Sequence, residues 1–151
     1  MNERASECVI ALAQLLIETM QRVDPGWRHA FLRIDAEEGA VGARSSYVSG
    51  SGVHLLGAVD HQDLYRRGIE IGEQLRAATR REDHAFKVCL LMADAAFNYA
   101  VKFDYEDAGR WMITKMGDAT GVPAGIGTSD LESLGRTAPL PSVRRPWYKF
   151  W

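Results

Sequence analysis

Acidic side chains are the residues of this sequence whose type and spacing could do chemistry. Asp104, Glu106 and Asp107 follow an apolar run, and Glu37 and Glu38 lie together between two others. Paired carboxylates can act as acid and base in glycoside hydrolysis, or bind a cation in phosphoester hydrolysis. The sequence supplies no base, nucleophile or further ligand beside either group. A solvated acidic edge, a partner-binding edge and a catalytic pair are therefore the three interpretations.

The other reactive residue types form no recognisable site. The four histidines do not pair with a Cys, a His or a carboxylate at metal-site spacing, and no HExxH or CxxC occurs. The glycine-rich stretch 121–128 lacks the lysine of a phosphate-binding loop, and no serine lies in a Gly-x-Ser-x-Gly turn. Cys8 and Cys89 have apolar neighbours, which is typical of buried free thiols in a reducing compartment. We expect no catalytic residues, no cofactor, no metal and no enzymatic activity.

The composition is that of one ordinary soluble domain. The 151 residues are 46% hydrophobic and 25% charged, and a chain of this length can bury a core without disulfides. The apolar runs are too short to span a membrane. The first residues carry two acids and no apolar stretch follows directly, which predicts a cytoplasmic protein without a secretory leader.

The charge is unevenly distributed along the chain. The formal net charge is −2, and residues 1–123 hold 14 Lys and Arg against 18 Asp and Glu. Residues 124–151 hold 4 against 2. Because phosphate contacts need clustered cations, the acidic body argues against nucleic acid as the ligand. It is compatible with a basic protein partner.

Apolar spacing predicts two amphipathic helices. In the first, apolar residues from Ala5 onward recur every three or four positions, and Asn2 is placed to cap the start. The second begins near Asp60, whose side chain is the expected N-cap. Its inner stripe includes Gly68 and Gly72, which cost helix propensity and suit close packing on a sheet.

Alternating apolar runs predict strands and two hairpins. The expected strands are 27–35, 41–48, 53–56, 86–92 and 97–103. Gly39 can supply a positive φ angle in the first hairpin turn, and Tyr99, Val101 and Phe103 share one face of the last strand. Two helices on one face of an antiparallel sheet of four to five strands would bury both stripes, so we predict an α+β fold.

The sequence changes character after the last predicted strand. We expect one α+β domain over residues 1–116, with a short helix at 110–116, and a Gly/Pro-rich loop and tail over 117–151. The tail ends with the aromatic residues Trp147, Tyr148, Phe150 and Trp151. Aromatic residues this dense rarely stay exposed, so we expect the tail to dock on the domain. A protein interface, including a homodimer, and stacking on nucleic acid are the alternatives.

The run from Phe97 to Asp107, which ends in Phe-Asp-Tyr-Glu-Asp, resembles a motif of the YezG-like immunity proteins, also called the DUF600 family. The order of expected elements over residues 5–107 is similar in outline, as are Trp27 at the first strand and the Trp-Tyr-Lys near the C-terminus. The resemblance implies an antitoxin that binds and silences a secreted bacterial toxin domain, often a nuclease. It would act by stoichiometric blocking in the cytoplasm of the producing cell.

The resemblance also implies which side chains contact the toxin. Acidic groups would steer the chain toward a basic groove, and aromatic anchors would carry most of the affinity. The expected toxin-binding residues are Asp104, Tyr105, Glu106, Asp107, Trp111, Glu37 and Glu38. The expected partner is a protein, with no nucleic acid and no membrane. Two other functions stay open, a small carboxylate-dependent hydrolase and a homo-oligomeric adaptor that uses the aromatic tail.

Overall fold

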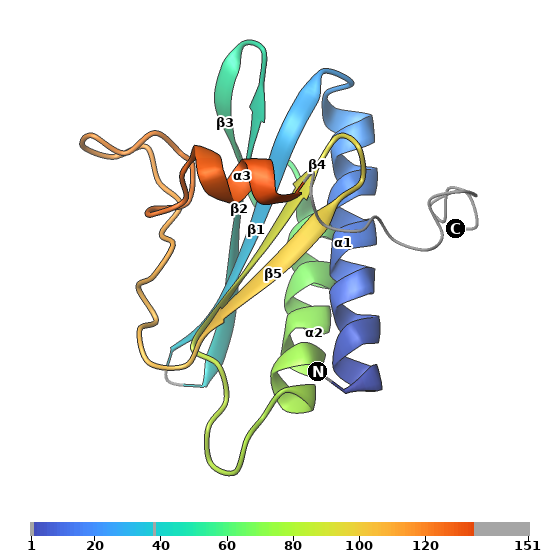
Figure 1. Ribbon diagram of the computed structural model, residues 1–151, viewed down its shortest axis with the longest axis vertical. Helices are drawn as coiled ribbons and strands as arrows, with labels where there is room; N and C mark the ends of the chain where they lie inside the picture. Colours follow the sequence, from blue (N-terminus) through green and yellow to red (C-terminus); the bar gives the residue numbers. More distant parts are fainter. Residues whose placement is uncertain (1, 38, 135–151) are drawn as a thin grey trace.

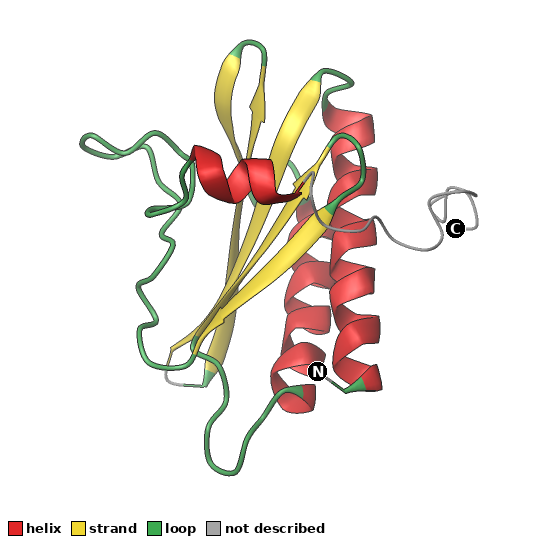
Figure 2. Cartoon of the chain, viewed as in Figure 1, coloured by secondary structure: helices red, strands yellow, loops and turns green. Residues whose placement is uncertain are grey.

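The computed structural model describes residues 2–37 and 39–134 of the chain. Its elements are, in order, α1 (Glu3–Val23), β1 (Trp27–Glu37), β2 (Ala40–Ser49), β3 (Gly52–Leu56), α2 (Gln62–Ala78), β4 (Val88–Asp94), β5 (Tyr99–Asp104) and α3 (Thr128–Leu134). The strands form one five-stranded sheet of order β3-β2-β1-β4-β5, and all neighbours are antiparallel (Figure 2). The α+β prediction is confirmed, with β3 and β5 as the two edges.

The two long helices lie side by side on one face of the sheet, as predicted (Figure 1). Asn2 caps α1, because its side-chain oxygen accepts a hydrogen bond from the Ala5 N–H at 2.8 Å. The predicted Asp60 cap of α2 is wrong. The His61 N–H bonds to the Gly57 carbonyl at 3.1 Å, and this backbone turn places the helix start at Gln62 without a side-chain cap.

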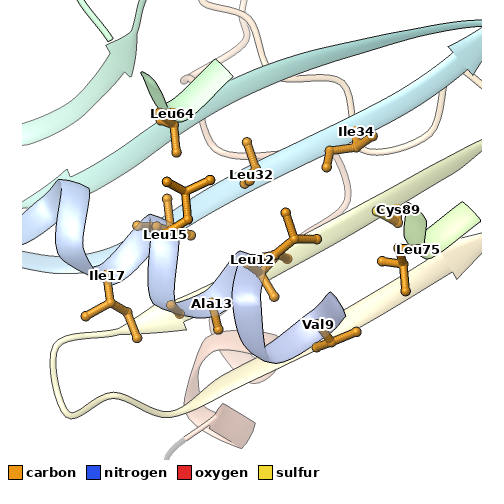
Figure 3. Close-up of a cluster of buried hydrophobic side chains, with 14 of the residues drawn as sticks. Val9, Leu12, Ala13, Leu15, Ile17, Leu32, Ile34, Leu64, Leu75 and Cys89 are labelled. Carbon is orange, nitrogen blue, oxygen red and sulfur yellow. The ribbon is translucent and has the colours of Figure 1, made fainter. Parts of the chain in front are cut away.

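The core between the helices and the sheet holds most of the buried apolar side chains (Figure 3). Gly72 of α2 packs closely on β1, since a methyl group at its Cα would lie 2.8 Å from the Ile34 Cδ1. At Gly68 the nearest atom is 3.5 Å away on Leu32, an ordinary contact. The predicted close packing of these glycines on the sheet is therefore confirmed. Gly72 leaves no room for a side chain, whereas Gly68 lies near β1 with room for a methyl group.

A second, smaller cluster covers the opposite face of the sheet. Its buried members are Phe31, Val88, Leu90, Met92, Trp111, Ile113 and Leu134. The predicted helix at 110–116 is wrong, because Trp111 adopts a positive φ of 57° and its ring enters this cluster. Instead, α3 forms within the expected loop, where Leu134 is buried in the cluster and Asp130 accepts the Gly127 N–H at 2.9 Å.

Two further predictions concern the C-terminal region and the membrane. The predicted docking of the aromatic tail concerns residues outside the described part of the chain, which ends at Leu134. Among the described helices, none is both long and apolar enough to cross a membrane.

Candidate functional site

The ends of three strands bring most of the predicted acidic residues to one end of the sheet. The Ala36 N–H donates to the Lys87 carbonyl at 2.8 Å, and the Lys87 N–H donates to the Asp104 carbonyl at 2.9 Å. Glu37 is exposed at the end of β1, with β4 between it and β5. Glu38 lies outside the described residues. The two predicted acidic groups thus share an end of the sheet without being adjacent.

Asp104 organises the turn that follows β5. Its Oδ1 accepts the backbone N–H groups of Glu106 and Asp107, both at 2.8 Å, and its Oδ2 pairs with the Arg110 guanidinium at 2.8 Å. The Arg110 guanidinium and the two N–H groups hold the pKa of Asp104 down at about 2. The carboxylate therefore stays ionised, and its hydrogen bonds and ion pair stabilise the turn.

The acidic turn (residues 104–110) is fastened to the centre of the sheet by Arg33. This side chain is 1% exposed and comes from β1. It donates from Nε to the Arg110 carbonyl at 2.9 Å, from Nη2 to the Ala108 carbonyl and from Nη1 to Asp35 at 2.6 Å. A buried guanidinium that satisfies two loop carbonyls fixes the backbone of the turn.

The structure divides the predicted binding residues into supporting and exposed ones. Trp111 is 4% exposed and packs in the second cluster, with the Arg110 guanidinium 4.7 Å from its ring centroid. Both carboxylate oxygens of Asp104 already accept hydrogen bonds from groups within the turn. Glu106 and Asp107 are exposed, so their carboxylates are the ones that a partner can reach.

Tyr105 lies half-buried between the acidic turn and the loop before β4. Its hydroxyl donates to the Thr79 carbonyl at 3.2 Å, and the Arg81 guanidinium lies 6.0 Å from its ring centroid. A cavity of about 500 Å³ adjoins the ring, and its lining residues are Arg81, His84, Lys87, Tyr105 and Glu106. Sequence reasoning did not connect Arg81, His84 and Lys87 with Tyr105, because basic side chains in a polar connecting loop look like ordinary solvated side chains.

The backbone of β5 is unpaired on its outer side. The Asn98 carbonyl accepts the Asp94 N–H at 3.0 Å, and in an antiparallel ladder alternate residues bond to the neighbouring strand. The N–H and C=O groups of Tyr99, Val101 and Phe103 therefore point away from β4, and no described strand pairs with them. An edge of this kind can accept an added strand.

These features together describe a surface suited to contact with another protein segment. An acidic turn adjoins a strand edge that offers backbone hydrogen bonds, and a cavity lined by Tyr105, Glu106 and three basic residues opens beside the turn. In the described part of the chain, no group of three His, Cys, Asp or Glu side chains could hold a metal ion. The chain matches no protein-family model and no curated protein, so the resemblance to YezG-like immunity proteins rests on the residues quoted above.

Proposed function

We propose that this protein is an immunity protein, an antitoxin that binds a cognate bacterial toxin domain in the cytoplasm and neutralises it by stoichiometric blocking. The observation that carries the proposal is the position of Glu106 and Asp107, exposed in a braced turn at the end of an edge strand. The resemblance of residues 97–107 to the immunity family supports the same function.

The mechanism would use two kinds of contact. The exposed carboxylates of Glu106 and Asp107 would attract a basic toxin surface and speed association. Rigidity matters as well, because Arg33 and Asp104 already hold the turn in place, so binding costs little conformational entropy. The ring of Tyr105, at the edge of its cavity, would supply an apolar contact beside these charges.

Charge reversal at the exposed acids tests the proposal. A Glu106→Lys, Asp107→Lys double variant should bind a toxin domain about 10- to 100-fold more weakly than the native chain does, because attraction becomes repulsion. It should also fail to rescue growth on co-expression. A matched control is Asp60→Lys, Glu70→Lys, two exposed acids of which one lies just before α2 and the other within it.

Asp104 is unsuitable for this test, since reversing it would remove two backbone hydrogen bonds and the ion pair with Arg110, whereas the Asp107 side chain accepts one turn hydrogen bond, from the Gly109 N–H at 2.9 Å. The affinity should be measured by calorimetry with both purified double variants. Unchanged affinity of the Glu106 and Asp107 variant would remove this surface as the binding site. Failure of the native chain to bind or to rescue would overturn the function itself.

A further inference from the structure

We propose that the chain's own C-terminal segment, residues 135–151, binds along the outer edge of β5 and over the acidic turn. This inference deepens the proposed function, because it places an intramolecular competitor on the proposed partner surface. The binding of the segment is tested without any toxin, so the two proposals can fail separately.

The first argument is the state of the β5 surface. Tyr99, Val101 and Phe103 are half-buried on the helix side of the sheet, where they pack against the main core. Their backbone N–H and C=O groups point outward without a partner strand in the described part of the chain. A strand whose apolar side chains and backbone groups are both incompletely covered favours the binding of an additional segment.

The second argument is where the described chain ends. Leu134 is 1% exposed in the second cluster, and α3 is held beside β5 by an ion pair between Lys102 and Asp130 at 3.0 Å. The 17 residues that follow can reach about 55 Å when extended, whereas the six residues of β5 span about 20 Å. The segment is therefore long enough to turn around this edge and follow the whole strand.

The third argument is chemical complementarity. The segment contains four cations and no carboxylate side chain, and four of its last five residues are aromatic. The cations are Arg136, Arg144, Arg145 and Lys149. They complement Glu106 and Asp107, while the aromatic side chains can cover the half-buried apolar side chains of β5. A second copy of the domain would instead present the same acidic turn and gain no charge complementarity.

The covalent link between residues 135–151 and the domain favours binding of this segment to β5. A covalently linked segment has an effective concentration in the millimolar range, so weak contacts suffice to keep it bound. A toxin that uses the same surface must displace it. Removing the aromatic side chains should therefore strengthen toxin binding.

Hydrogen exchange of individual backbone amides tests the proposal in the full-length chain. We compare the native protein with a Trp147→Ser, Tyr148→Ser, Phe150→Ser, Trp151→Ser variant. The amides of Tyr99, Val101 and Phe103 should exchange at least 10-fold faster in the variant, because their outward N–H groups lose acceptors. The amides of α1 and the edge strand β3 serve as internal controls and should not change.

The other results would each overturn the proposal. Equal exchange rates in the two chains would mean that the segment does not cover β5. Protection that rises with protein concentration would assign the edge to a second copy, and protection that appears only with the toxin domain would assign it to the partner. If exchange is equal and the toxin still binds, the proposed function stands without this inference.

Discussion

Arg33 and Asp35, two residues apart on β1, form a 2.6 Å ion pair on the face of the sheet opposite the long helices. Arg33 is fully enclosed, whereas the Asp35 side chain is 25% exposed. The same guanidinium holds the carbonyls of Ala108 and Arg110. One buried cation thus connects the central strand to the acidic turn.

Replacing Arg33 by methionine should destabilise the protein strongly. The carboxylate of Asp35 and two loop carbonyls would lose their donor, which costs about 3 kcal/mol when a buried pair is broken. Urea unfolding measures the change. Arg66→Gln is the matched control, because its ion pair with Asp63 is exposed on both sides and should change stability by less than about 0.5 kcal/mol. Equal stabilities of the two variants would contradict the role of Arg33.

Two glycines of α2 should respond in opposite directions to alanine. At Gly72 the new methyl would collide with Ile34, and overpacking of this kind costs about 1–3 kcal/mol. At Gly68 it meets ordinary contacts, so the gain in helix propensity should dominate by up to about 1 kcal/mol. Urea unfolding of both variants gives the comparison.

A double-mutant cycle identifies the collision partner. Ile34→Val removes the Cδ1 atom nearest to Gly72, so it should recover part of the stability lost in Gly72→Ala. Strict additivity of the two substitutions would show that the Cδ1 atom is not the obstacle, because valine keeps the Cγ2 atom, which would lie 2.9 Å from the new methyl.

Acid should weaken the turn through Asp104. Its folded-state pKa of about 2 lies below the value of about 4 in an unfolded chain. The stabilisation is therefore complete above pH 4 and is lost as the pH falls toward 2. The free energy of unfolding of the native chain should approach that of Asp104→Asn over this window.

The control for the acid prediction is Asp118→Asn, an exposed residue without a side-chain hydrogen bond in the described structure. Because this side chain braces no turn, its replacement should not reproduce the loss of stability expected for Asp104→Asn. A pH-independent difference for Asp104→Asn would contradict the proposed ionisation.

The two thiols should be inert in the folded protein. Burial raises the pKa of Cys89 to about 12 and also raises that of Cys8. Because the thiolate is the reactive form, a thiol-reactive aromatic disulfide at pH 8 should modify neither residue until urea unfolds the chain. A Cys8→Ser variant assigns the reaction, and rapid modification of the native protein would show that either site opens.

Periodicity predicted the two long helices well because each carries a regular apolar stripe, and the strands were found as runs between turn residues. Boundaries that depend on backbone geometry were missed. The positive φ of Trp111 replaces a predicted helix turn, and α3 forms where glycine and proline suggested a loop.

The position of the acidic residues in the fold followed from the sequence, but what each side chain does in the turn did not. The string around Asp104 was expected after the last strand and lies there, yet charge alone could not show that Asp104 braces the turn while Glu106 and Asp107 face solvent. The burial of Arg33 could not be predicted from sequence patterns either, because its carbonyl partners lie more than 70 residues away in the sequence.

The cover over the second face of the sheet comes from one uninterrupted part of the chain, residues 108–134, whereas the helical layer comes from two separated segments. Exchanging this one segment for another would therefore change the surface on the second face of the sheet and leave the helical layer intact. Arg33 sets the condition for such an exchange. Any replacement would have to offer two carbonyl oxygens at the positions that Ala108 and Arg110 now hold.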